Sequence, residues 1–548
     1  MKKIIVVIIV CMIIISGMFM YNKSDKKDLL EDNNGPIIAA VIDGKASTSF
    51  PTTNKYVATV ECTRNGKKID ANESITWNGT KWILTTAISD GNVRCNAIFR
   101  TPNFAETILA NNEVQTPLTT PGKEVSAHVL DDVESETESV SSTYQAYYIT
   151  YGTGWEANGT NFNLTGTAVT SDTYANSYSS LVGKYLPNSS LSKAGSSTAG
   201  TMQTTTNLSC VYYVVSATSS SYTYKALCSN KNTTEALLAS TVDDYGTSYY
   251  FRGAVKNNYI EFANKCWRIV RITGDGSVKL VLHNDNTAGA ANPCSSANNS
   301  TDAAIARYSG TTYDSAFNTD YNDNAYIGFM YGTAGASDYA TTHANTNKST
   351  ILTNLETWYN NNLESYESKL ADTIWCNDKS TFTTFTSGLT YGTGLGYGTN
   401  ETGYGSYNRV HGGNSASYVS PSLVCPNDNN GGKLSKFTVK DTTNGNGNLT
   451  YKIGLLTADE IAFAGYAARL QNSTTYLQEN ATNAWWWSLS PYRFNGISAG
   501  VGRVYSGALL NRDVYQNKSG GVRPAISLIS STNVTGDGTS ENPYIVAS

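Results

Sequence analysis

The sequence has few charged residues and no excess of basic ones. Charged residues make up 15% of its 548 positions, against roughly a quarter in an average soluble protein. The formal net charge is -5, so the chain lacks the basic field that holds phosphates, and we exclude sequence-independent nucleic-acid binding. Its polarity comes instead from 37 tyrosines, 46 glycines and abundant Asn, Ser and Thr, which is typical of a β-rich extracellular protein.

The sequence also lacks the motifs of common metal, cofactor and catalytic sites. No C-x-x-C pair and no H-E-x-x-H occurs, so we predict no metal and no cofactor. Residues 496–500 match G-x-S-x-G, but no helix-forming run follows to build a nucleophile elbow. Residues 320–325 lack the glycine and distant glutamate of an EF-hand. We therefore predict no catalytic residue, and place the scattered histidines His283, His343 and His411 in exposed loops.

One long uncharged run stands at the N-terminus. Lys2 and Lys3 precede residues 4–20, whose length is close to the roughly 17–25 residues that span a bilayer. Positive charge on the short side predicts a cytoplasmic N-terminus and export of the remainder. We therefore predict a single-pass membrane anchor over residues 1–21 and a charged spacer over 22–34, with secretion after signal-peptide cleavage as the alternative.

Eight cysteines lie outside this run, an even number that suits disulfides in an oxidising compartment. Spacing alone does not fix connectivity, but neighbours in sequence fall within the same predicted unit. We therefore predict sequential pairs, with reduced, buried thiols as the alternative. The candidates are Cys62 with Cys95, Cys210 with Cys228, Cys266 with Cys294, and Cys376 with Cys425.

Two β-rich regions are predicted to form a stalk. Residues 35–112 carry short β-prone runs separated by turns and predict a small antiparallel domain, for which an immunoglobulin-like sandwich is one arrangement. Residues 113–142 are acidic and predict a solvated linker. Residues 143–240 predict a second β-rich domain with cross-strand tyrosine packing; an aromatic carbohydrate platform is the alternative. Those tyrosines are Tyr212, Tyr213, Tyr222 and Tyr224.

The remaining residues, 241–548, predict a third domain. CWRIVRI and VKLVL flank residues 274–276, which predicts a hairpin with Trp267 in the core, and a terminal hairpin is predicted around residues 536–538. Apolar spacing predicts a helix within residues 349–375. A strand is predicted over 451–456, followed by a helix that begins at a capping box of Thr457 and Glu460.

Several segments of this domain together resemble a known family. CWRIVRI (266–272), GLLTADEIAFAGYAARL (454–470), WWWSLSP (485–491) and GGVRPAISL (520–528) resemble bacterial domains of unknown function related to the formylglycine-generating-enzyme fold, a branch of the C-type-lectin-like folds. The resemblance covers about residues 243–548 and implies an α+β domain with long loops around a small sheet. The anchored arrangement resembles surface proteins of Gram-positive bacteria.

The chemistry of those relatives does not carry over. The oxidising enzymes use two copper-binding cysteines near their C-terminus, but no cysteine follows Cys425. The calcium-dependent lectins combine E-P-N or Q-P-D with W-N-D, and neither combination occurs. Because one fold hosts both catalytic and binding proteins, the resemblance does not assign an activity.

The polar segment between the tryptophan run and Gly520 is the predicted binding surface. Adjacent tryptophans in a strand alternate faces, so at least one of Trp485, Trp486 and Trp487 is expected in the core. The residues after them carry the aromatic and hydrogen-bonding groups favoured at recognition surfaces. The predicted ligand-binding residues are Tyr492, Arg493, Asn495, Arg503, Tyr505, Asn511, Arg512 and Tyr515.

Together these features predict a multidomain, membrane-anchored, non-enzymatic surface protein. Its C-terminal domain is predicted to bind a surface ligand, whether a glycan, a protein or a cell-wall component, or to mediate adhesion. A structural or pilus-like surface subunit is the first alternative. The second is an enzyme whose active-site carboxylates are brought together only by the fold.

Overall fold

The computed structural model describes a β-rich chain with few helices, which confirms the coarse prediction. The chain forms two compact units, Met1–Pro102 and Asn103–Ser548. The predicted anchor and spacer lie outside the described residues. These are 37–70, 72–87, 92–117, 120–122, 135–139, 146–147, 150–151, 156–158, 161–163, 166–167, 174–175, 179, 182, 185–186, 210–218, 221–228, 236–308, 311–312, 314–414, 418–468, 475–482, 485–505, 508–514 and 519–546.

The first unit contains a five-stranded sheet, ordered β2-β1-β7-β3-β4, and a β5–β6 hairpin. Trp82 of the hairpin packs against Phe99 of the sheet, with ring centroids 5.4 Å apart. The prediction of a wholly antiparallel domain is wrong, because β1 and β7 run parallel. The strands are β1 (Ile37–Ile42), β2 (Lys45–Ser47), β3 (Val57–Arg64), β4 (Lys67–Ile69), β5 (Ser74–Trp77), β6 (Trp82–Thr85) and β7 (Val93–Arg100).

A four-stranded sheet, ordered β15-β16-β17-β8, falls in the second predicted β region. Its strand β8 lies within the predicted acidic linker and pairs with β17. Three two-stranded pairs accompany it: β9 with β14, β10 with β13 and β11 with β12. The strands are β8 (Ser135–Ser139), β9 (Ala146–Tyr147), β10 (Thr150–Tyr151), β11 (Glu156–Asn158), β12 (Asn161–Asn163), β13 (Gly166–Thr167), β14 (Tyr174–Ala175), β15 (Tyr185–Leu186), β16 (Cys210–Ala217) and β17 (Ser221–Cys228).

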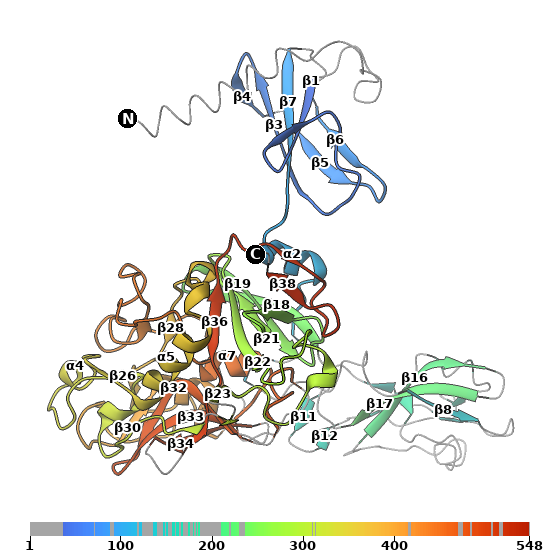
Figure 1. The fold of residues 1–548 in the computed structure, drawn as a ribbon. Helices are drawn as coiled ribbons and strands as arrows, with labels where there is room; N and C mark the ends of the chain where they lie inside the picture. The colour runs from blue at the N-terminus through green and yellow to red at the C-terminus, as the bar shows by residue number, and fades with distance from the viewer. Residues whose placement is uncertain are drawn as a thin grey trace, which may run out of the picture. The chain divides into compact units, whose positions relative to one another are not determined.

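An eight-stranded sheet joins the final segment of the chain to residues 236–284. Its order is β18-β19-β21-β20-β38-β37, and β22 pairs with both β21 and β36. Figure 1 shows the green strands β18–β22 beside the red β36 and β38, in agreement with their pairing. The strands are β18 (Ala236–Asp243), β19 (Gly246–Gly253), β20 (Tyr259–Phe262), β21 (Lys265–Ile272), β22 (Val278–Asn284), β36 (Ala525–Leu528), β37 (Val534–Thr535) and β38 (Tyr544–Val546).

Both predicted hairpins are confirmed. β21 and β22 pair antiparallel around Gly274–Gly276, and β37 pairs with β38 around Gly536–Gly538. Every residue of β21 and β22 is buried, including Trp267, so this hairpin lies inside the unit. The arginines and lysines of these two strands are therefore buried as well. Buried charges need partners within the fold that neutralise them.

A seven-stranded sheet carries the tryptophan run. Its order is β25-β35-β32-β30-β29, and β33 pairs with β32 and β34. Trp486 and Trp487 are buried, whereas Trp485 is half-buried, which confirms that the run enters the core. The strands are β25 (Asp314–Ser315), β29 (Thr381–Phe382), β30 (Thr402–Tyr404), β32 (Trp486–Phe494), β33 (Ala499–Tyr505), β34 (Ala508–Asp513) and β35 (Gly520–Gly521).

The helix predicted within residues 349–375 is confirmed as α5 (Thr350–Asn362). Ser349 caps its start, because its side chain accepts a hydrogen bond from the Leu352 amide at 3.3 Å. It buries Leu355 and Trp358 in the core and ends at the asparagines. The other helices are α2 (Phe104–Asn111), α4 (Tyr339–Thr342), α6 (Gly405–His411) and α7 (Ala458–Phe463), with 3₁₀ turns η4 (Ser296–Asn298), η5 (Asn324–Ile327), η6 (Glu364–Lys369) and η7 (Gly412–Asn414).

The segment before α7 differs from the prediction. The capping box of Thr457 and Glu460 is confirmed, but residues 451–456 are not a strand, and only Gly454 makes a bridge, to Ala525. A Cβ atom on Gly454 would lie 2.5 Å from the Trp375 ring, so the backbone here packs against an indole. The short pairs nearby are β23 (Arg307–Tyr308) with β24 (Thr311–Thr312), β26 (Met330–Tyr331) with β27 (Asn347–Lys348), and β28 (Trp375–Cys376) with β31 (Lys436–Phe437).

Three of the four predicted disulfides are confirmed: Cys62–Cys95, Cys266–Cys294 and Cys376–Cys425. Cys62 and Cys95 face each other on adjacent strands of one sheet, unlike the inter-sheet bridge of an immunoglobulin domain. Cys210 and Cys228 face each other across β16 and β17, and their bridge stays a prediction. In the described ranges, which begin at residue 37, no helix is long and apolar enough to cross a membrane.

Candidate functional site

A cleft of about 430 Å³, lined by both polar and apolar groups, opens beside β20. Its walls come from the residues after β19, from residues 475–482 and from the final hairpin. Backbone hydrogen bonds join these walls: Tyr476 donates to the Gly253 carbonyl at 2.9 Å, and Tyr259 donates to the Gly538 carbonyl at 2.8 Å. The cleft is within the size range of small-molecule sites, roughly 300–1,000 Å³.

Glu479 supplies the carboxylate of this cleft. Its Oε2 accepts hydrogen bonds from the Tyr259 hydroxyl at 2.6 Å and from Arg268 at 2.7 Å, and its Oε1 accepts one from Asn299 at 2.9 Å. The side chain remains 37% exposed. Because a carboxylate has about four acceptor positions, Glu479 is both fixed in place and able to accept a further hydrogen bond from a ligand.

Arg268 holds Glu479 from the interior. Its guanidinium is fully buried, lies 3.7 Å from the centroid of the Tyr259 ring, and also donates to Asn258 and to the Val255 carbonyl. Burial raises the pKa of Tyr259 to about 12, although Arg268 opposes this shift, so the phenol donates to Glu479 at neutral pH. Arg268 thus makes an ion pair with Glu479 from a fully buried position.

Apart from Glu479, the polar side chains that line the cleft are neutral, except for the cationic Lys256. Lys256, Ser296 and Thr482 are exposed on its lining, together with the half-buried Ser540. Among the described residues that line the cleft, Glu479 is the one carboxylate, whereas glycoside hydrolysis generally needs two. The arrangement therefore suits hydrogen bonding to a neutral, hydroxyl-bearing ligand better than it suits hydrolysis.

A second cleft, of about 390 Å³, lies on the other side of Ala254, Val255 and Lys256, which line both. The C-terminal end of α2 and the residues after it contribute amide and carboxylate side chains, and Asn257 donates to Asn112 at 2.7 Å.

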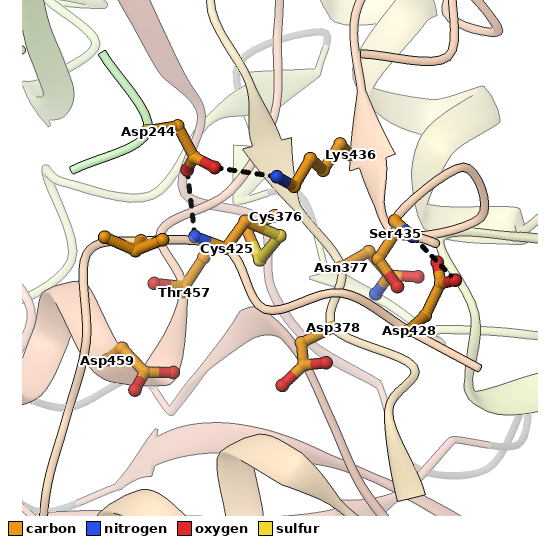
Figure 2. Close-up of a disulfide and its surroundings, with 12 residues drawn as sticks. Asp244, Cys376, Asn377, Asp378, Cys425, Asp428, Ser435, Lys436, Thr457 and Asp459 are labelled. Carbon is orange, nitrogen blue, oxygen red and sulfur yellow. Dashed lines mark hydrogen bonds and ion pairs between the residues drawn. A yellow bond between two sulfur atoms is a disulfide. The ribbon is translucent and has the colours of Figure 1, made fainter. Parts of the chain in front are cut away.

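The fold does gather carboxylates around the Cys376–Cys425 disulfide, as the enzyme alternative requires. Figure 2 shows Asp244 bonded both to the Cys425 amide, at 2.8 Å, and to Lys436, at 2.9 Å. On the other side of the disulfide, Arg409 bridges Asp378 and Asp459, at 2.7 and 2.8 Å. The two aspartates and the arginine between them are largely buried.

A second buried ion group adjoins this one. Glu460 accepts hydrogen bonds from Arg271 at 3.0 Å and from Lys279 at 2.7 Å, and Arg271 also bonds to Asp243 at 2.5 Å. The cavity among these groups is about 20 Å³, which holds about one water molecule. Each of these carboxylates has a cationic partner and no substrate fits between them, so we assign the network a structural role.

The predicted Tyr/Arg surface is divided between the two ends of the β32–β33 hairpin, where Phe494 pairs with Ala499 and Trp486 with Val504. Near the turn, Tyr492 is buried, Arg493 is half-buried and Asn495 is exposed. Tyr492 therefore packs in the interior and does not contribute to an exposed binding surface.

The other end of the hairpin carries a stack of aromatic and arginine side chains. The Arg503 guanidinium lies 4.9 Å from the ring centroids of both Trp485 and Tyr505, and Tyr505 is 48% exposed. Asn511 and Arg512 belong to β34, which pairs with β33, and Tyr515 lies outside the described residues. Only Arg503 and Tyr505 of the predicted set are thus brought into one described cluster.

The prediction of exposed histidines is wrong. His283 and His343 are fully buried, and His411 is 6% exposed. His343 Nε2 lies 2.7 Å from the Gly396 carbonyl, and His283 Nε2 lies 3.2 Å from Asn480 Nδ2. Polar sequence neighbours suggested surface loops, but His283 lies in β22, His411 in α6, and His343 at the C-terminal end of α4.

The two motif matches set aside above have structural roles. Residues 496–500 cover the β32–β33 turn and the first two residues of β33, so a strand and not a helix continues from the motif. Asp323 caps η5 by accepting a hydrogen bond from the Ala325 amide at 2.9 Å. Across the described parts of the chain, no group of three His, Cys, Asp or Glu residues is placed to hold a metal ion.

The fold and the cleft define a β-rich, disulfide-containing protein with a carboxylate held in place at a cleft. No family model, curated protein or solved structure matches the chain. The resemblance to formylglycine-generating-enzyme and C-type-lectin-like folds therefore stays a prediction.

Proposed function

We propose that this chain is an exported, membrane-anchored bacterial surface protein that binds a neutral, hydroxyl-rich ligand of the glycan class in the Glu479 cleft. The observation that carries the proposal is the partly exposed carboxylate of Glu479, which three donors fix at the wall of a cleft that also exposes apolar surface. Sugar hydroxyls donate and accept hydrogen bonds, so they match a lining of carboxylate, ammonium and hydroxyl groups.

Two independent features support the proposed location. The disulfides suit an oxidising compartment, and the uncharged run after Lys2 and Lys3 supports a membrane anchor with the bulk of the chain outside. The Arg503–Tyr505 stack adds a second exposed aromatic surface, which extends the recognition area if the ligand is a polymer.

Blocking the cleft is expected to abolish glycan binding. The full chain, purified in detergent, is screened against a glycan array, and the best ligand is titrated against Thr482→Arg and Lys256→Ala. The arginine fills the cleft and removes measurable binding, whereas loss of the Lys256 ammonium weakens binding roughly tenfold, or about 1.4 kcal/mol.

Exposed residues of the same kinds outside the cleft provide the controls. Thr333→Arg and Lys440→Ala should leave affinity unchanged. Equal affinity of Thr482→Arg and the unmodified protein would rule out this cleft. Ordered self-assembly without binding to any glycan would instead support the structural-subunit alternative.

A further inference from the structure

Lys379 is a fully buried lysine in contact with a buried carboxamide. Its Nζ lies 2.6 Å from Asn345 Oδ1 and 3.0 Å from the Met330 carbonyl, and it sits 5.3 Å from the centroid of the Phe437 ring. Lys379 is 0% exposed and Asn345 is 4% exposed. The amine is therefore held against an amide group in a space that excludes bulk water.

No carboxylate neutralises this lysine within the described residues. Burial lowers the pKa of Lys379 to about 7, and Asp428 offsets this only in part. The oxygens of Asp428 already accept hydrogen bonds from the amides of Asn430, Gly432 and Leu434. A buried ammonium without a counter-ion is unfavourable, so near neutral pH a large fraction of Lys379 is the free amine, which is the nucleophilic form.

One short loop positions both partners. The Leu434 carbonyl accepts a hydrogen bond from Asn345 Nδ2 at 3.3 Å, and the Ser435 hydroxyl accepts one from the Lys379 amide at 2.9 Å. Asn345 also has a left-handed backbone, with φ of 58°, which fixes the direction of its side chain. Residues 34 positions apart in sequence are thus held together by the same turn.

We propose that Lys379 and Asn345 form an intramolecular isopeptide bond. The lone pair of Nζ attacks Asn345 Cγ, a bond forms between Nζ and Cγ, and the bond between Cγ and Nδ2 breaks. One proton passes from Nζ to the departing nitrogen, which leaves as ammonia. An amine and a primary amide thus give a secondary amide and ammonia, and the step needs no oxidant, reductant or co-reactant.

Two physical effects support this reaction. Fixed neighbours react as though present at very high concentration, with effective molarities that reach roughly 10⁵–10⁸ M in well-oriented cases. The product also removes the buried ionisable group and replaces it with a neutral amide. The bond closes a covalent loop that contains α5, and in an exported protein it resists reduction, unlike the Cys376–Cys425 bridge, whose first cysteine lies within that loop.

Peptide mass spectrometry of the full chain tests the proposal directly. The protein is denatured, reduced, alkylated, treated with an amine-acylating reagent and digested. We expect the peptides that contain Asn345 and Lys379 to appear joined, with a combined mass lower than their sum by one ammonia, and Lys379 to escape acylation. Recovery of both peptides in linear form, with acylated Lys379, would overturn the proposal.

Variants confirm the assignment of the two partners. Lys379→Met removes the nucleophile and Asn345→Ala removes the electrophile, so either change should abolish the joined species. Asn347→Ala alters an exposed asparagine two residues away and should preserve it. The measurement on the unmodified chain does not depend on how the variants fold, and it is independent of ligand binding, so its outcome is separate from that of the glycan experiment.

Discussion

Replacing Glu460 by glutamine is expected to lower the free energy of unfolding of the second unit by about 3–5 kcal/mol, the usual cost of breaking one side of a buried ion pair. Glu460 is 3% exposed and accepts hydrogen bonds from Arg271 and Lys279, both buried. Burial disfavours its ionisation, but Lys279 and Arg271 outweigh that effect and lower its pKa to about 2.

The glutamine variant removes the negative charge of Glu460 and keeps a side chain of nearly the same size. A carboxamide oxygen can still accept the hydrogen bond from the Thr457 amide, which Glu460 Oε2 accepts at 3.0 Å, so the capping box of α7 survives. In this variant the Lys279 ammonium keeps its contact with the Trp375 ring, whose centroid lies 4.3 Å away. A cation–π contact does not neutralise the ammonium.

Urea unfolding of the full chain, followed by tryptophan fluorescence, measures the effect. Glu364→Gln, an exposed glutamate, is the control and should shift the midpoint little, because exposed charges contribute about 0–1 kcal/mol. A Glu460→Gln midpoint equal to that of the control would show that the network does not stabilise the unit.

The local elements of this fold were predictable because their signals are local. The turn at Gly274–Gly276 lies between two β-prone runs, and the capping box of Thr457 and Glu460 spans four residues. The apolar spacing of α5 likewise needs no knowledge of the rest of the chain. These features depend on backbone conformation and on neighbours in sequence, so one sequence is enough to find them.

The candidate site was not predictable in the same way. Glu479 meets Arg268 and Tyr259 across more than 200 positions of sequence, and no spacing rule relates such residues. The available signal was the set of cations in the strand β21, Lys265, Arg268 and Arg271, which imply partners without naming them. Residues 451–456 have an apolar pattern that fits a strand, but only Gly454 makes a bridge, and the Trp375 ring packs on it where a side chain would lie.

The histidines were misplaced because polarity of the flanking sequence does not report burial. His283 lies on β22, a strand whose seven residues are all buried. His343 caps the C-terminal end of α4 and is enclosed by Tyr339 and Tyr404, with ring centroids 4.7 and 6.1 Å away. Their burial has a thermodynamic consequence that the sequence alone did not suggest.

Acidification is expected to destabilise the second unit through these two histidines. Burial, reinforced by Arg268 and Arg523 around His283 and by Lys379 near His343, holds both pKa values well below 6.5. The unfolded chain takes up protons below pH 6.5 while the folded unit does not, so stability is present above that pH and is lost as pH falls. While the folded imidazoles stay neutral, each histidine contributes a loss of about 1.4 kcal/mol per pH unit below pH 6.5, and the two losses add.

The pH window separates the histidines from other groups. A free amine on Lys379 has a pKa of about 7 in the folded state. Well below pH 7 the lysine is protonated in both the folded and the unfolded state, so it no longer changes the dependence of stability on pH. Glu460, with a pKa of about 2, contributes stability that is lost only below its unfolded value of about 4.5. Between pH 6.5 and 5 the slope of the urea midpoint against pH therefore reports mainly on His283 and His343.

Non-titrating replacements test this assignment. In the double variant His283→Gln and His343→Gln, the urea midpoint is expected to depend much less on pH between 6.5 and 5, even if the variant is less stable at pH 7.5. The Glu479 carboxylate lies 3.8 Å from His283 Nε2 and favours protonation, but burial and the two arginines outweigh it. A slope in the double variant equal to that of the unmodified chain would assign the acid sensitivity to other groups, and would show that both imidazoles take up protons as readily in the folded unit as in water.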